Sequence, residues 1–240
     1  MKVGWAFLRT MTRALAIKLV VSTVLNLVLY GVLLFGPAGT WHWWRAWAFL
    51  GIILFGTLVT LRVLLPGSEG VLNERLKFPF PKDQPLADKI VGMLLITEIL
   101  ALIAFIPLDV FRFHLLSKPG AFVSCGGLVL LGLGWIIVTL ACKENPFAAA
   151  AVRLQEERQH RVIDTGVYSI VRHPMYSGAI LQFVGIALWL ESYAAALLII
   201  VLMATLALRV FVEERFLKQK LDGYEAYTKR VRYRLVPCVW

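Results

Sequence analysis

The segment TGVYSIVRHPMYSG, residues 165–178, concentrates polar and aromatic side chains directly before an apolar run. Pro174 disfavours the helical conformation at His173 and itself fits the first turn of a helix, so this segment predicts a helix start. A helix start offers free backbone N–H groups and a partial positive charge, which suit a carboxylate or phosphate. Arg172 strengthens that preference, and Tyr176 adds an aromatic face and a hydroxyl group. The alternative is that these side chains only anchor the chain at a membrane boundary.

A second group of ionisable side chains lies near the end of the last apolar run. Arg209 and Glu213 are four residues apart, which places them on one helix face, and Glu214 is next to them. Ionisable residues at the end of a membrane span are costly and are therefore functional candidates. The alternative is a simple ion pair at the membrane interface. If the last two apolar segments form a hairpin, this face returns to the boundary where the Arg-His-Pro segment lies.

The elements that position these groups are expected to be membrane-spanning helices. The chain has 240 residues, is 59% hydrophobic and 17% charged, and has a mean hydropathy of +0.74, which is too apolar for a soluble domain. Apolar segments of about 20 residues, the length that crosses a bilayer core, predict four full spans. These cover residues 14–36, 43–65, 86–108 and 120–142. Two further runs, 177–190 and 193–212, flank Glu191-Ser192 and predict a C-terminal helical hairpin. The predicted fold class is therefore all-α, a polytopic transmembrane helix bundle in a single domain over residues 1–240.

Lysine and arginine residues gather in alternate loops. The N-terminus, the 66–89 loop, the 143–175 loop and the tail after Val212 hold three, four, five and seven of them, against three in the other loops. Cytoplasmic loops carry such an excess, so both termini and residues 165–178 are predicted on the cytoplasmic side. This distribution accounts for the net charge of +10, and no nucleic-acid partner is predicted.

Cysteines and glycines give no sign of a metal or nucleotide site. The three cysteines are an odd number without metal-site spacing, so neither a disulfide framework nor a metal ion is predicted. Four glycines of the fourth predicted span predict close helix packing and not a nucleotide-binding loop. They are Gly126, Gly127, Gly132 and Gly134.

The order and spacing of the polar positions resemble the isoprenylcysteine carboxyl methyltransferase-like family of integral membrane methyltransferases, which is related to the phospholipid methyltransferases. The N-terminal half, with WHWWRAW and the NERL loop, resembles bacterial members more loosely, which predicts a bacterial inner membrane location. The matching positions are His160 to Ile163, Gly166-Val-Tyr168, Arg172-His173-Pro174, Tyr176, Arg209-x-x-x-Glu213-Glu214, and Tyr224-x-x-Tyr227 with Val231 and Pro237.

The resemblance implies a methyltransferase whose cofactor is S-adenosyl-L-methionine, bound at the cytoplasmic face in a site unlike that of soluble Rossmann enzymes. Residues 1–142 are then expected to form the substrate-side half and residues 143–240 the cofactor-binding half. Arg172 is expected to take part because the cofactor's carboxylate suits the positive helix start. Arg209 is implied to face the substrate. The other implied cofactor contacts are Gln155, His160, Val162, Ile163, Tyr168, His173, Pro174, Met175, Tyr176 and Glu213.

The methyl acceptor stays open at this point. A carboxylate acceptor needs no general base and could be held bidentately by Arg209, whereas an amine or thiol would use a base, for which Glu214 is the candidate. The expected partners are a lipophilic or small-molecule acceptor and membrane lipids. The alternatives are a phospholipid amine methyltransferase and a non-catalytic membrane protein that binds a nucleotide-like ligand as a sensor or transporter component. Glu98, inside an apolar span, either lines the substrate path or pairs with Lys18 or another buried polar group.

Overall fold

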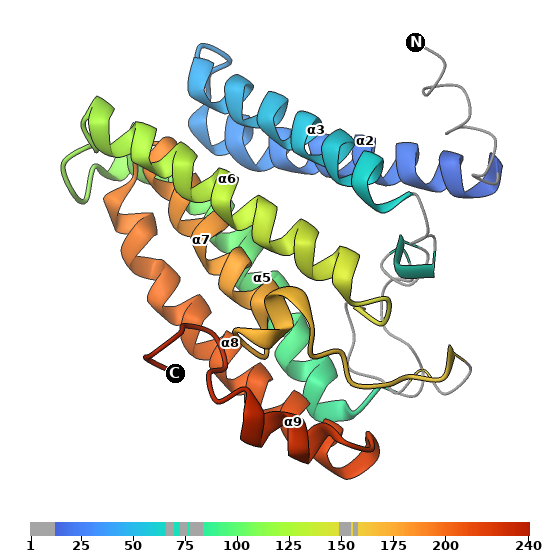
Figure 1. Ribbon diagram of the computed structural model, residues 1–240. Coiled ribbons are helices and arrows are strands. Elements are labelled where there is room, and N and C mark those ends of the chain that lie inside the picture. The colour runs from blue at the N-terminus through green and yellow to red at the C-terminus, as the bar shows by residue number, and fades with distance from the viewer. Residues whose placement is uncertain (1–12, 66–69, 73–75, 77–83, 149–154, 156–157) are drawn as a thin grey trace.

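Every regular element that the structure, a computed structural model, describes is a helix (Figure 1). The described residues are 13–65, 70–72, 76, 84–148, 155 and 158–240. Lys2 and Arg9 of the basic N-terminus, and most of the 66–89 loop with residues 73–75 of its NERL segment, lie outside them. The all-α polytopic bundle predicted from the sequence is confirmed.

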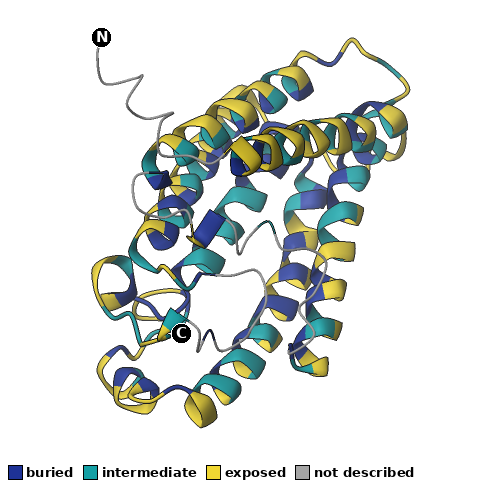
Figure 2. Cartoon of the chain, turned by 90° about the vertical axis from the view of Figure 1, so that its right-hand side faces the viewer, coloured by how far each residue is buried: buried dark blue, intermediate teal, exposed yellow. Residues whose placement is uncertain are grey.

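The four predicted spans are present within a few residues of their expected bounds. They are α2 (Arg13–Ala38), α3 (Trp44–Leu64), α5 (Leu86–Leu108) and α6 (Ala121–Glu144), and a π-helical turn, η1 (Asp109–Phe113), continues α5. In the most apolar stretch of each span only 11 to 33% of the residues are buried inside the protein. Exposed residues follow the outer faces of the helices in Figure 2. Apolar side chains therefore point outward along these helices, as the hydrocarbon core of a bilayer requires.

The predicted C-terminal hairpin is also present. It consists of α7 (Pro174–Trp189) and α8 (Tyr193–Lys220), joined by a turn at residues 190–192. The Ser192 hydroxyl oxygen accepts the amide of Ala195, which caps α8, and the hydroxyl donates to the buried Asp109 carboxylate at 2.7 Å. Among the residues that the structure describes, five helices are long and apolar enough to cross a membrane, namely the four spans and α8, whereas α7 has only 16 residues.

The helices form two groups that meet along α6 and α7. In Figure 1, α2 and α3 lie side by side above α6, while α7 and α8 return beneath it with α5 beside them. The main apolar core lies between these groups, and it includes the fully buried side chains of Phe49, Ile103 and Leu131. This arrangement brings the end of α8 and the start of α7 to one end of the bundle.

Glycines bring the backbones of α6 and α7 into direct contact. A Cβ atom on Gly134 would lie 2.4 Å from the carbonyl oxygen of Gly178, and one on Gly185 would lie 2.5 Å from that of Gly127. The predicted close packing is confirmed for Gly127 and Gly134. It is wrong for Gly126 and Gly132, where an added Cβ would meet nothing within 4 Å, because they lie on other faces of α6. The paired glycines fix α7, and therefore its first residues, against α6.

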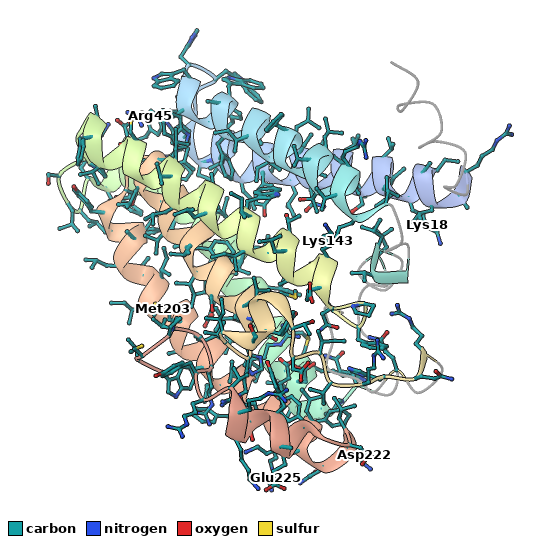
Figure 3. All side chains as sticks on the ribbon, viewed as in Figure 1. Lys18, Arg45, Lys143, Met203, Asp222 and Glu225 are labelled. Atoms are coloured by element: carbon teal, nitrogen blue, oxygen red, sulfur yellow. The ribbon has the colours of Figure 1, made fainter. Side chains whose placement is uncertain are left out.

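The opposite end of α7 is tied to the start of α3. The Arg45 guanidinium donates to the Trp189 carbonyl at 2.9 Å, and the Trp189 indole donates to the Arg45 carbonyl at 3.0 Å. Arg45 also pairs with Glu191 in the hairpin turn at 3.3 Å. Figure 3 places Arg45 at one end of the bundle and Asp222 and Glu225 at the other.

Candidate active site

The predicted helix start is present at Pro174, the first residue of α7. His173 has a non-helical backbone, with φ −125° and ψ 61°, as expected for a residue before proline. The C-terminal tail closes over this point, because the amide of Arg172 donates to the Tyr233 carbonyl at 3.0 Å and that of His173 to the Arg234 carbonyl at 2.9 Å. Two segments about one quarter of the chain apart in sequence thus meet where α7 begins.

Glu214 is a buried carboxylate surrounded by cationic and imidazole groups. Its Oε1 accepts a hydrogen bond from Arg172 Nε at 2.6 Å and lies 3.3 Å from His173 Nε2, and its Oε2 accepts from Arg234 Nε at 3.1 Å. Arg172 and His173 are only 7% and 6% exposed. They therefore do not reach outward as interfacial anchors, and Glu214 holds the helix start, the end of α8 and the tail together.

The Arg172 guanidinium has further partners in the tail. Its terminal nitrogen donates to the carbonyl oxygens of Val231 at 2.6 Å and Arg232 at 2.8 Å. Three of its contacts are therefore protein groups. The predicted contact of Arg172 with a bound anion stays a prediction.

Glu213 lies on the other side of the same histidine. Tyr176 Oη donates to Glu213 Oε2 at 2.7 Å, and His173 Nδ1 is 3.9 Å from that oxygen. The rings of His173 and Tyr176 are nearly parallel, at 5° and 5.6 Å between centroids. The Glu213 side chain is 23% exposed, so the site combines a flat aromatic wall with an accessible carboxylate edge.

Arg209 reaches the site from the α8 face that also carries Glu213. Its guanidinium carbon lies 5.9 Å from the centre of the Tyr176 ring, and its Nε is 3.2 Å from Asp88 Oδ1. Asp88 is fully buried at the start of α5, where Gln84 donates to its other oxygen. The sequence did not single out Asp88, since an acidic residue in the first helical turn already has a local explanation in the helix dipole.

Tyr168 connects the site with the tail helix. It lies in the short helix η3 (Gly166–Ser169), and its carbonyl accepts from Tyr227 Oη at 2.8 Å. Tyr227 belongs to α9 (Tyr224–Arg230), where it forms a small core with Leu221, Tyr224 and Val231, against which Val162 packs. Burial raises the pKa of the Tyr168 phenol above its ordinary range, so the hydroxyl stays neutral.

The remaining predicted cofactor contacts lie in other surroundings. The His160 ring stacks on Phe147 at 4.4 Å, and Gln155, which is 1% exposed, donates to the Phe147 carbonyl at 2.9 Å. Met175 packs against an apolar cluster that includes Leu19 of α2, Leu64 of α3 and Cys142 of α6, and Ile163 is half-buried. The structure thus gathers Arg172, His173, Pro174, Tyr176, Arg209, Glu213 and Glu214 at one point, and the cofactor contacts predicted for the other residues stay predictions.

Glu98 pairs with a neighbouring helix. Thr205 of α8 donates to Glu98 Oε1 at 2.7 Å, and Lys18 is exposed on α2. The expectation that Glu98 bonds to a buried polar group is confirmed with Thr205 and is wrong for Lys18. Any role of Glu98 in a substrate path stays a prediction.

Comparison with known proteins points to the helices that carry this site. Residues 122–222 match a family model described as phospholipid methyltransferase, and they cover nearly all of α6 and the whole of α7 and α8. The chain is 34% identical to a rice protein (Oryza sativa subsp. indica) named probable protein-S-isoprenylcysteine O-methyltransferase, over 46% of this chain and 59% of that protein. It is 31% identical to protein-S-isoprenylcysteine O-methyltransferase B of Arabidopsis thaliana, over 48% of this chain and 59% of that protein. The match thus spans less than two thirds of each of these relatives.

Proposed function

We propose that this chain, whose C-terminal half is related to the isoprenylcysteine and phospholipid methyltransferases, is an S-adenosylmethionine-dependent methyltransferase of the membrane. The resemblance inferred from its motifs is confirmed by the family match, and its helices support an integral membrane protein. The observation that carries the proposal is the meeting of the α7 start with Glu213 and Arg209 of α8 inside the matched region. The acceptor is proposed to be lipophilic or small.

The residues at this point fit the charges of the proposed cofactor. The α7 start favours the cofactor's carboxylate, because a helix N-terminus carries partial positive charge. The Glu213 carboxylate favours its cationic sulfonium and amino groups, and the parallel rings of His173 and Tyr176 offer aromatic faces to the same charges. Glu213 is accessible, whereas Glu214 is 3% exposed, so Glu213 is the carboxylate assigned to the cofactor.

The proposed reaction requires the protein mainly to align the acceptor with the methyl group that is transferred. When bound, the cofactor supplies a methyl group whose bond to sulfur breaks, with the electron pair left on sulfur, while a new bond forms to the acceptor. Arg209 holds the acceptor in line, since a planar guanidinium can bind Asp88 and an acceptor through different nitrogens. Glu214 keeps His173 in position, because its carboxylate contacts His173 and is itself held by Arg172 and Arg234. A carboxylate or thiolate acceptor releases no proton, and an amine releases one to water.

Removing either Glu213 or His173 is expected to weaken cofactor binding. Glu213→Ala and His173→Ala should each weaken the binding of S-adenosylmethionine by roughly 1.5 to 3 kcal/mol, the range for hydrogen bonds to charged groups. Isothermal titration calorimetry on the detergent-solubilised protein measures this change. Glu225→Ala, in the exposed ion pair with Lys229 on α9, is the matched control and should bind like the parent. If both site variants bind S-adenosylmethionine as tightly as the parent, Glu213 and His173 have only a structural role.

Methyl transfer itself separates the enzyme from a sensor or transporter component. The parent protein, given a cofactor with a radiolabelled methyl group, should transfer label to a component of a total membrane lipid extract or to a small thiol. Cofactor binding without transfer to any fraction would instead support the non-catalytic alternative. Label on amine-headed phospholipids would identify the phospholipid amine methyltransferase.

The proposed location is a bacterial inner membrane with both termini in the cytoplasm. The site then faces the cytosol, where the cofactor is found. Single cysteines at Ser169 and Lys229 should react with an impermeant maleimide from the cytoplasmic side, and one at Ser117 from the opposite side, after Cys125 and Cys238 have been replaced by serine. All three target positions are exposed. Labelling of Ser169 and Lys229 from opposite sides would contradict the orientation.

A further inference from the structure

The C-terminal tail turns back from α9 to the membrane-spanning part of α8. In Figure 1 the C-terminus lies beside α8. Ser177, in the first turn of α7, donates to the Leu235 carbonyl at 2.6 Å. The Trp240 ring lies 5.6 Å from the ring of Phe211, which precedes Glu214 by three residues on α8. Residues 235–240, called the tail turn here, therefore lie at the level of the α7 start.

The tail turn is closed by backbone hydrogen bonds and presents apolar side chains outward. The amides of Leu235 and Val236 donate to the Trp240 carbonyl at 2.9 and 3.1 Å, and the Trp240 amide donates to the Val236 carbonyl at 3.1 Å. The side chains between these ends point away from the protein, since Val236 is 45% and Val239 is 78% exposed. A turn that satisfies its own backbone groups can enter a partly apolar environment at little cost.

The outer face of α8 shows what environment this is. Val201, Leu208 and Phe211 are seven and three residues apart, so they share one helix face, and all three are exposed. Arg215 and Lys218 continue the same face and are also exposed. The order apolar, aromatic, basic is that of a helix leaving the hydrocarbon core of a bilayer. Because Trp240 contacts this face at Phe211, the tail turn extends the lipid-facing surface at the level of the headgroups.

The exposed charges beside the tail turn are basic. Residues 231–240 contain two arginines and no acidic residue, and Arg232 is exposed. Arg215 and Lys218 add two exposed cations on the neighbouring face of α8. Each such cation near a membrane surface is attracted to anionic lipid headgroups. Apolar side chains flanked by cations fit a membrane that contains anionic phospholipid.

Arg234 connects the tail turn with the candidate active site. Its guanidinium carbon lies 5.2 Å from the ring centre of Phe211 and 5.2 Å from that of Trp240, so it is held between the two rings. Its Nε donates to Glu214 Oε2 at 3.1 Å, and Glu214 in turn contacts His173. A shift of Trp240 would remove one of the two rings that hold Arg234 against Glu214.

We infer that the tail turn contacts the headgroup region of a membrane that contains anionic phospholipid, and that this contact keeps Arg234 in place on Glu214. Arg234 is then a positioning residue whose support is provided in part by the bilayer. A lipid partner is favoured over a protein partner because the tail turn is continuous with the lipid-facing side of α8. The lipid contact stands by itself, whereas its effect on the cofactor rests on the proposed function.

The depth of the tail turn can be measured without catalysis. Val239→Cys, in the protein in which Cys125 and Cys238 have been replaced by serine, carries a nitroxide in nanodiscs of phosphatidylcholine and phosphatidylglycerol. In electron paramagnetic resonance power saturation, this label should be more accessible to oxygen than to a water-soluble nickel chelate. Lys229→Cys, exposed on α9, is the matched control and should show the reverse.

Two results of this measurement would overturn the inference. Chelate accessibility at Val239→Cys equal to that at Lys229→Cys would place the tail turn in water. Shielding from both oxygen and the chelate would mean that a protein surface, such as a second copy of the chain, covers the tail turn instead of lipid.

The effect on the active site is expected to appear as a dependence of cofactor affinity on lipid charge. The parent protein should bind S-adenosylmethionine about fivefold more tightly in nanodiscs that contain phosphatidylglycerol than in phosphatidylcholine alone. Val239→Asp, which adds a negative charge to the tail turn, should bind equally in both membranes. Ala226→Asp adds the same charge on an exposed position of α9 and should keep the difference.

Equal affinity of the parent in the two membranes would overturn the link between lipid contact and Arg234. The same conclusion would follow if Val239→Asp kept the full difference. If the parent binds no S-adenosylmethionine in either membrane, the proposed function fails, and the depth measurement still decides the lipid contact.

Discussion

Replacing Glu214 with alanine is expected to lower the free energy of unfolding by about 3 to 5 kcal/mol, the usual cost of removing one partner from a buried ion pair. The reason is that Arg172, 7% exposed, would lose its carboxylate partner, and His173 and Arg234 would lose theirs at the same point. Equilibrium unfolding in mixed detergent micelles, followed by circular dichroism, measures the loss. Cofactor affinity should fall as well, since His173 would no longer be held.

Two further variants make this expectation specific to the buried carboxylate. Glu225→Ala removes an exposed carboxylate with a single lysine partner and should unfold like the parent. Glu214→Gln keeps the shape of the side chain and should be intermediate in stability. A Glu214→Gln protein with parent-like stability and cofactor affinity, but without turnover on an amine or thiol, would show that Glu214 is the general base and not a positioning residue.

Replacing Arg209 with lysine is expected to lower turnover by about two orders of magnitude or more, because a small misplacement of a reacting group can cost that much. A lysine ammonium can remain near Asp88, which is fully buried and 3.2 Å from Arg209 Nε. It lacks the further N–H groups with which a planar guanidinium can bind an acceptor at the same time. Cofactor affinity should stay within a few-fold of the parent. Steady-state kinetics on the acceptor found in the lipid-extract assay, together with calorimetry, separates the two quantities.

The matched control is Arg215→Lys, on an exposed position of α8 less than two turns further along. It should retain parent-like kinetics. Equal proportional losses of cofactor affinity and turnover in Arg209→Lys would place Arg209 in the cofactor site or in a structural ion pair. The substrate-orienting role assigned to it would then be wrong.

The features predicted correctly from the sequence are those that local chemistry determines. Continuous apolar runs are sufficient to define membrane spans, because backbone groups in a bilayer must be satisfied within each helix. Pro174 is sufficient to define the start of α7, since proline restricts the residue before it and fits the first helical turn. The hairpin turn follows from two polar residues between apolar runs.

Contacts between segments that are far apart in the sequence could not be predicted from local patterns. Arg209 was considered with Glu213, four residues on, whereas its ion pair is with Asp88, more than one hundred residues earlier. Helical periodicity shows which residues share a face but not which helix that face meets. Likewise, nothing local indicates that Arg234 of the tail would bind Glu214, or that Gly127 and not Gly126 would meet α7.

The shortness of α7 sets the depth at which the proposed reaction takes place. Sixteen residues span about 24 Å, less than the hydrocarbon core of about 30 Å, and the Arg45–Trp189 bonds hold the far end of the helix in place. If the Trp189 end of α7 lies at one membrane surface, the shortfall is at Pro174. Beyond this level α8 continues with Arg215, Lys218 and Lys220, which are exposed and suited to phosphate headgroups. The proposed site would then lie beneath the headgroup layer, where a lipophilic acceptor could react without leaving the bilayer and the water-soluble cofactor would have to enter from the headgroup side. The thickness of the surrounding bilayer then becomes part of the geometry of the reaction.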